Sequence, residues 1–260
     1  MKKNKFDLMV AHLASEFSKI SNLDLITTDP DGKKAFNLVI FRLSEIISYK
    51  ELISNHFVPA TNKAIVDSKN DILRSMYRHF LDIKSMDFSE SLHDTLRLAY
   101  VGLFHKIESF IGSLEEIGNI LFSEDGTYKR NVMEWAKKSY KFDFKDWSRF
   151  DVIHKIYWIC ICVKHYDGFP LKKPLPSSIV AHDLTRRISV SVKEFKEDCD
   201  MLLKVYNVLI SLFLSFVISK KMIDDIDREV HDGNPELLKI REETRYKLDQ
   251  LLKEIASKIS

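Results

Sequence analysis

The scarcity of glycine and proline is the feature that most restricts the fold of this chain. Seven glycines and six prolines occur among 260 residues, or about 5 %, whereas average usage gives about 12 %. Sandwiches, propellers and glycine-rich phosphate-binding loops need more turn residues than this, so these classes are excluded. Hydrophobic residues make up 45 % of the chain, which is enough to build a core and argues against disorder.

Hydrophobic residues recur at helical spacing in segments that are separated by turn signals. The patterns predict helices over 6–20, 33–57, 60–84, 89–122, 131–140, 146–166, 191–230 and 235–259. The second ends before Pro59, and the third places Met76 and Phe80 on its apolar side. Residues 167–178 (DGFPLKKPLPSS) hold three prolines and predict an extended loop. The expected fold is therefore all-α, a multi-helix bundle with long C-terminal helices.

The segment SEDGT (123–127) is a clear turn and the best boundary within the chain. It predicts an N-terminal helical region over 1–124 and a second over 125–260, with one continuous domain over 1–260 as the alternative. Three glycines lie inside the predicted helix 89–122: Gly102, Gly112 and Gly118. Because each costs about 1 kcal/mol against alanine, we expect them to permit close approach of a neighbouring helix.

Three cysteines are too few and odd in number for a disulfide framework, so a reducing cytoplasm is expected. Cys160 and Cys162 are spaced poorly for zinc and fit two small apolar side chains on a buried helix. The N-terminus begins like a signal peptide, but charged residues interrupt its apolar stretch. The stretch 202–219 is uninterrupted only over 208–218, which is shorter than the about 20 residues of a bilayer span. We therefore expect no transmembrane segment and no membrane partner.

Common catalytic motifs are absent from the sequence. It contains no GxxxxGK[ST], GxGxxG, HExxH, GxSxG or DxDxDG pattern. Glu90-x-x-His93 has the spacing used in di-metal bundles but lacks a second copy. We therefore expect neither a metal site nor a cofactor.

The segment 129–176 is basic and aromatic, although the whole chain carries a formal charge of only +2. It holds eleven Lys or Arg against five Asp or Glu, and ten of the 29 aromatic residues. Cations that neutralise phosphates, beside rings that stack on bases, are typical of single-stranded RNA binding. The alternative is that the rings pack into the core and the lysines form a solvated face.

Within this segment, Arg149 is followed five residues later by His154, and Lys164-His165 precedes a turn at Gly168. This pattern resembles the HEPN superfamily, small all-α proteins of prokaryotic toxin–antitoxin, abortive-infection and other defence systems. The resemblance implies metal-independent RNA cleavage, generally with two motifs brought together across a homodimer.

In the chemistry that the resemblance implies, Arg149 holds the phosphate and its developing charge. His154 shuttles a proton between the 2′-hydroxyl and the leaving oxygen. Four further residues are candidates for binding the RNA substrate: Lys164, His165, Lys172 and Lys173. A HEPN-like fold with a degenerate site is the other form of this hypothesis.

A second polar cluster is expected on the helix 89–122, where His93 and Arg97, and His105 and Glu108, have helical spacing. Glu108 could orient His105 at the edge of a groove, but a salt-bridged seam between packed helices is the favoured interpretation. The rival to the whole RNA hypothesis is a non-catalytic interaction protein, antitoxin-like or a scaffold, that binds a partner through its C-terminal helices. A membrane-surface protein is a third option and would need Lys172 and Lys173 to flank an exposed apolar face.

Overall fold

The computed structural model describes residues 30–83, 86–121, 150–176 and 185–206, together with 235–236, 238–240, 242–243, 246 and 250. Within these residues the regular structure is helical and contains no strand, which confirms the all-α prediction. The chain forms two compact units. The first comprises Met1–Phe41, Phe110–Ser148 and Val205–Ser260, and the second Arg42–Ser109 and Arg149–Lys204. The predicted boundary at 123–127 lies outside the described residues and stays a prediction.

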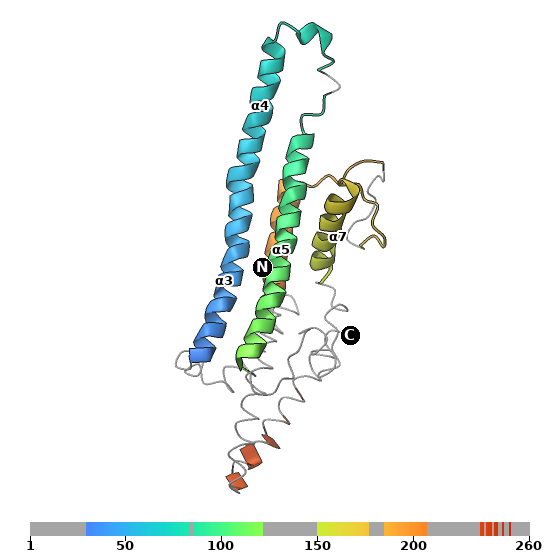
Figure 1. The fold of residues 1–260 in the computed structure, drawn as a ribbon. Helices are drawn as coiled ribbons and strands as arrows, with labels where there is room; N and C mark the ends of the chain where they lie inside the picture. Colours follow the sequence, from blue (N-terminus) through green and yellow to red (C-terminus); the bar gives the residue numbers. More distant parts are fainter. Residues whose placement is uncertain are drawn as a thin grey trace, which may run out of the picture. The chain divides into compact units, whose positions relative to one another are not determined.

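One continuous helix runs through Pro59, where the sequence predicts an end. It consists of α3 (Pro30–Leu52), the π-helical turn η1 (Ile53–Phe57) and α4 (Val58–Arg74) (Figure 1). The Val58 N–H donates to the carbonyl of Ile53, a spacing of five residues. Pro59 lacks an N–H, and its ring would clash with the carbonyl four residues earlier in a regular α-helix. The wider π turn directly before it lets the helix pass without a break.

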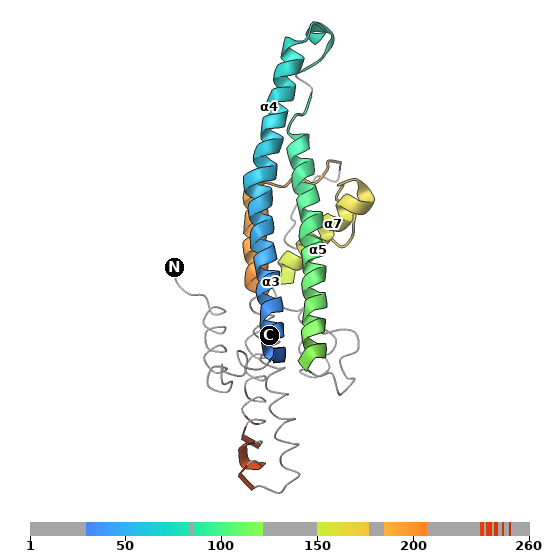
Figure 2. The same ribbon diagram turned by 60° about the vertical axis from the view of Figure 1, so that its left-hand side comes forward.

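The helix α4 ends at Arg74, about ten residues before the predicted end, and a single 3₁₀ turn η2 (Arg78–Phe80) follows. Met76 and Phe80, which the sequence places on an apolar helix side, are instead 79 % and 85 % exposed. Figures 1 and 2 show the end of α4 and η2 extending past the first turn of α5. The helical periodicity of these residues therefore does not mark a core face.

The core of the second unit lies between α5 (Glu90–Leu121), α7 (Asp151–Tyr166) and the helix 192–206. The bounds of α5 agree with the predicted helix 89–122, and α7 ends at the predicted Tyr166 but begins at Asp151, five residues after the predicted start. The fully buried side chains include Tyr100 and Leu103 of α5, Trp158 of α7, and Phe195, whose ring meets Tyr100 edge-on at 5.5 Å. Ser191 caps the last of these helices, because its Oγ accepts the N–H of Glu194 at 3.1 Å.

The segment that follows α7 is an extended loop, as its prolines predict. The helix ends at Asp167 and Gly168, both with positive φ, and the Gly168 N–H donates to the carbonyl of Cys162 at 3.0 Å. The indole N–H of Trp158 donates to the carbonyl of Lys172 at 2.8 Å. The loop is thereby tied back to the buried side of α7.

In the first unit, the rings of Phe110 and Tyr206 stack with their centroids 3.7 Å apart. Leu114, one turn after Phe110 on α5, is buried as well. The predicted helices 6–20 and 131–140 and most of the C-terminal pair lie outside the described residues. No described helix has the length and apolar character needed to cross a membrane.

Candidate functional site

The exposed side of α7 carries most of the described candidate residues. His154, Tyr157, Lys164 and His165 all project to solvent, and their helical spacing places them on one surface. We refer to these four residues as the α7 face. The opposite side of α7, with Ile156 and Trp158 among others, is buried. One amphipathic helix therefore presents two imidazoles, a phenol and an ammonium together.

His154 lies in the first turn of α7 and is exposed. Its ring meets the ring of Phe150 edge-on, with the centroids 5.2 Å apart. Phe150 is 6 % exposed and packs into the core, so its ring limits the directions that the imidazole can take. Arg149 lies outside the described residues, and its convergence with His154 stays a prediction.

Lys164 contacts His105 of α5, which in turn contacts Glu108, and the sequence placed both of these α5 residues in a separate cluster. Its Nζ lies 3.5 Å from Nε2 of His105, and Nδ1 of His105 lies 2.9 Å from Oε2 of Glu108. We call these three residues the His105 cluster. His105 and Glu108 are 56 % and 54 % exposed. The predicted contact of Glu108 with His105 is confirmed, whereas no helix among the described residues covers the pair, so the packed seam is not found there.

An aromatic pair lies beside this cluster. The rings of Phe104 on α5 and Tyr157 on α7 are 5.3 Å apart and tilted, and the Lys172 ammonium lies 5.3 Å from the centre of the Tyr157 ring. Lys172 is half-buried, whereas Lys173 is exposed. The structure thus gathers a phenol ring and two ammonium groups on neighbouring parts of α5, α7 and the loop.

The aromatic residues of the basic segment divide between core and surface. Phe150 and Trp158 are buried, and Tyr157 and Tyr166 are exposed by 38 % and 39 %. The prediction of stacking rings thus remains open for two of these four rings, while the other two belong to the core. Sequence reasoning missed Phe104, which has no polar atom and no motif to distinguish it.

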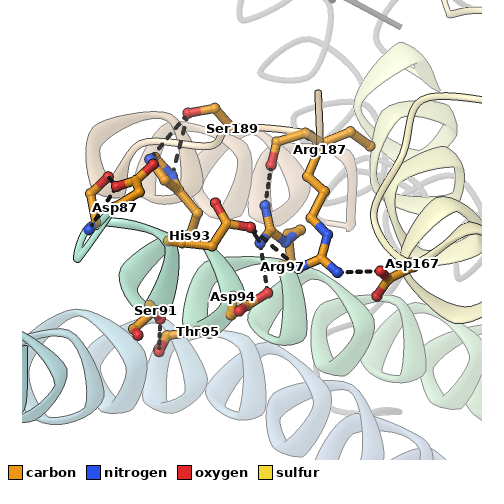
Figure 3. Close-up of polar contacts among 12 residues, drawn as sticks. Asp87, Ser91, His93, Asp94, Thr95, Arg97, Asp167, Arg187 and Ser189 are labelled. Carbon is orange, nitrogen blue, oxygen red and sulfur yellow. Dashed lines mark hydrogen bonds and ion pairs between the residues drawn. The ribbon is translucent and has the colours of Figure 1, made fainter. Parts of the chain in front are cut away.

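The other half of the predicted α5 cluster is a buried brace (Figure 3). Arg97 is 2 % exposed; it donates to the carbonyl of Ile188 at 2.8 Å, to Asp94 at 2.6 Å, and to Glu90. The expected pairing of His93 with Arg97 is wrong, since the His93 ring instead lies within 3.3 Å of the Ser189 hydroxyl. For Arg97 the prediction of a packed, salt-bridged seam is confirmed.

The turn at Gly168 packs on the same guanidinium. A Cβ at Gly168 would lie 3.0 Å from Cδ of Arg97, and its carbonyl accepts the Ile188 N–H at 2.8 Å. Arg187 also bonds to Glu90 and to Asp167 (Figure 3). The Gly-containing turn that contributed to the HEPN resemblance therefore joins the end of α7 to α5 and to the segment 187–190.

A second buried polar group connects α5, α7 and the helix 192–206. The Lys155 Nζ lies 2.7 Å from both Glu194 and Asp198, and the Tyr100 hydroxyl donates to Asp198 at 2.5 Å. Burial raises the pKa of Asp198, although the bonds from Lys155 and Tyr100 act to lower it. Burial opposes the Lys155 ammonium, but its two carboxylate partners outweigh this and raise its pKa. The Lys155 and Asp198 side chains are 12 % and 14 % exposed and the Glu194 side chain is 40 % exposed, so these charges link the three helices at the edge of the core.

The cysteines behave as small apolar side chains. All three are buried, and the expectation for Cys160 and Cys162 is confirmed. Burial raises the pKa of both of these thiols. Among the described residues, no three His, Cys, Asp or Glu side chains are grouped so that they could hold a metal ion.

The chain matches no protein-family model, no curated protein and no solved structure. The resemblance to HEPN proteins therefore stays a prediction from Arg149, His154 and the Lys164-His165 turn.

Proposed function

We propose that the protein binds single-stranded RNA along the α7 face and cleaves it without a metal ion, in the manner of a HEPN-like ribonuclease. The observation that carries this proposal is the gathering of His154, Lys164 and His165 on one exposed side of a helix, next to Tyr157 and Lys172. Arg149 and His154 are the proposed catalytic pair. A prokaryotic defence or toxin–antitoxin role follows from the resemblance alone.

The chemistry of this surface suits a polyanion with exposed bases. Ammonium groups at Lys164, Lys172 and Lys173 can neutralise phosphates, while the Tyr157 ring offers a flat apolar face for a base. His154 supplies a proton acceptor at one end of the helix. A second copy of the chain would supply the second motif in a dimeric arrangement.

The test is incubation of the purified protein with total RNA in the presence of EDTA. We expect cleavage by the wild type and a lower rate of cleavage in Arg149→Ala and in His154→Ala. Lys193→Ala is the matched control, because this exposed lysine lies on the helix 192–206 and pairs only loosely with Glu197, at 3.9 Å. Absence of cleavage by the wild type, or equal cleavage by all four proteins, would contradict the proposal.

A non-catalytic interaction protein is the second candidate, and the end of α4 favours it. Met76, Tyr77 and Phe80, which we call the α4 tip, are 79 %, 63 % and 85 % exposed. Arg74 and Arg78 flank these side chains. Aromatic residues, methionine and arginine are the types enriched in the centres of protein interfaces.

The predicted partner surface on the C-terminal helices is described only in part. The side chains of Leu238, Ile240 and Tyr246 there are exposed by 39 %, 49 % and 66 %.

Sedimentation velocity over a concentration series tests the role of the α4 tip. We expect the wild type to self-associate and the Met76→Ser/Phe80→Ser double variant to do so less. A wild type that stays monomeric throughout would remove self-association as the role of this tip.

A further inference from the structure

We propose that the His105 cluster is a second reactive site on the same bound RNA, with His105 as the general base that activates a ribose 2′-hydroxyl. The inference rests on the proposed RNA function but uses residues that the HEPN resemblance does not include. It is carried by the contacts that join Glu108, His105 and Lys164 on two helices.

The neighbours of His105 determine which ring nitrogen carries its proton. A carboxylate can only accept hydrogen bonds, so Nδ1, which lies 2.9 Å from Glu108, carries the hydrogen. An ammonium can only donate, so Nε2, which faces Lys164 at 3.5 Å, presents a lone pair. These contacts favour the tautomer with the hydrogen on Nδ1, in which the Nε2 lone pair faces Lys164.

Exposure separates this cluster from the braces of the core. The Arg97 side chain is 3 % exposed and each of its polar partners has a structural role, whereas His105 and Glu108 are more than half exposed. A pair this exposed adds little to stability, and a substrate hydroxyl would take the place of the Lys164 ammonium at Nε2, which frees this ammonium for the phosphate. The Phe104–Tyr157 rings and Lys172 lie alongside, so a strand bound to them would pass the cluster.

The reaction at this site is an intramolecular phosphoryl transfer. His105 Nε2 takes the proton of a 2′-hydroxyl, the 2′-oxygen forms a bond to the adjacent phosphorus, and the bond from phosphorus to the 5′-oxygen breaks. The leaving 5′-oxygen takes a proton from solvent, and His105 later releases its own to solvent. The Lys164 ammonium stabilises the charge that develops on the non-bridging oxygens. The products are a 2′,3′-cyclic phosphate and a 5′-hydroxyl, and no oxidant, metal or net water is needed.

The cluster cannot share a phosphate with His154. Lys164 follows His154 by ten residues, which is about 15 Å along a helix that rises 1.5 Å per residue. A single phosphodiester does not span this distance, so each site acts on its own linkage. The two can therefore be inactivated one at a time.

The decisive experiment uses end-labelled single-stranded RNA in EDTA and compares three proteins. We expect the Arg149→Ala/His154→Ala double variant to retain cleavage that gives 2′,3′-cyclic phosphate ends. Adding His105→Ala to this variant should lower the remaining rate at least about a hundredfold, the usual contribution of a general base. An RNA with a single 2′-deoxy residue at the cleaved position should resist the double variant.

Glu108 is a positioning residue, and its test separates orientation from structure. Glu108→Ala should lower kcat with KM unchanged, and Glu108→Gln, which keeps an acceptor oxygen, should restore part of the loss. Nitrogen-15 NMR of His105 should show the Nδ1–H form in the wild type and a shift toward Nε2–H in Glu108→Ala. The exposed ion pair Lys193–Glu197 supplies the control, since Glu197→Ala should change neither readout.

Each outcome has one meaning. Cleavage that depends on Arg149 and His154 but not on His105 overturns this inference and leaves the proposed function standing. Cleavage that is unchanged in the Arg149→Ala/His154→Ala variant and lost when His105→Ala is added supports the inference and removes the catalytic pair of the proposed function. A wild type without any cleavage overturns both, and the NMR result then assigns Glu108 and His105 a non-catalytic contact.

Discussion

Gly102 and Gly112 lie ten residues apart on α5 and have opposite surroundings. A Cβ at Gly102 would lie 2.0 Å from the hydroxyl oxygen of Tyr49. The Tyr49 side chain lies against α5 at this point, and its hydroxyl donates to the carbonyl of Ala99 at 3.0 Å. A Cβ at Gly112 would meet none of the described residues within 4 Å. The prediction of close helix packing is therefore confirmed for Gly102 and wrong for Gly112, and Gly118 lies where side chains are not described.

These two glycines make a matched pair for a stability test. Gly102→Ala should displace the Tyr49 ring and lower the free energy of unfolding by about 1–3 kcal/mol. Gly112→Ala should raise it by up to about 1 kcal/mol, because alanine favours the helix and open space receives the methyl group. Urea unfolding measures the free energy of unfolding of both variants. Equal effects of the two substitutions would show that Tyr49 does not pack against Gly102.

The buried thiols lead to a prediction about reactivity. Burial, with a smaller contribution from the Asp198 charge, raises the pKa of Cys199 from 9.0 to about 12. The reactive thiolate is then about a thousandfold scarcer near neutral pH. At pH 8 iodoacetamide should leave Cys160, Cys162 and Cys199 unmodified in the native protein and alkylate all three in guanidinium chloride. Mass spectrometry counts the alkylated cysteines in each state. Rapid labelling of native Cys199 would contradict its burial.

At the scale of elements, Arg97 joins α5 to the end of α7 and to the segment 187–190. It reaches Glu90 and Asp94 on its own helix and the carbonyl of Ile188 across the chain. Gly168, at the end of α7, packs on its side chain. This guanidinium therefore supports the position of α7 relative to α5, together with the Lys155 and Phe104–Tyr157 contacts.

Arg97→Ala should lower the free energy of unfolding by about 2–3 kcal/mol, since the buried carbonyl of Ile188 loses its donor. The loss stays below that of a fully enclosed ion pair because the Glu90 and Asp94 carboxylates are 37 % and 52 % exposed. Arg187→Ala is the control, because Arg187 shares Glu90 but is solvated and should change stability much less. Thermal melts in which Arg187→Ala lowers the Tm more than Arg97→Ala would contradict the bracing role of Arg97.

For the whole molecule, charge is nearly balanced in total and uneven along the sequence. The formal charge is +2, yet the segment 129–176 has eleven basic against five acidic residues. In the described part of that segment, Lys164 belongs to the α7 face and Lys172 lies over the Tyr157 ring of the same face. Lys173 follows in the loop and is exposed. An RNA strand would be attracted to this region by its phosphates before any base contact forms.

This distribution predicts how affinity for RNA depends on salt. If Lys164 and Lys172 each neutralise a phosphate, the double Lys→Ala variant should reduce the slope of log K against log salt concentration by about 1.4, or about 0.7 for each contact with a single strand. Lys193→Ala should leave the slope unchanged. Fluorescence anisotropy of a labelled oligonucleotide between 50 and 300 mM salt measures it. An unchanged slope in the double variant would place the RNA elsewhere on the protein.

The sequence alone determined the helical class, the extent of α5 and the end of α7, because few turn residues and a strong 3.6-residue period are local properties. It also located the proline loop and the i, i+3 contact of Glu108 with His105. Tertiary structure decided what covers each apolar or polar side. Met76 and Phe80 have helical spacing but extend past their neighbour, and Pro59 lies within a helix because a π turn precedes it. His105 and Lys164, 59 residues apart, meet only because α5 and α7 pack together. A periodic pattern reports which side chains share a face, whereas the partner of that face comes from distant parts of the chain.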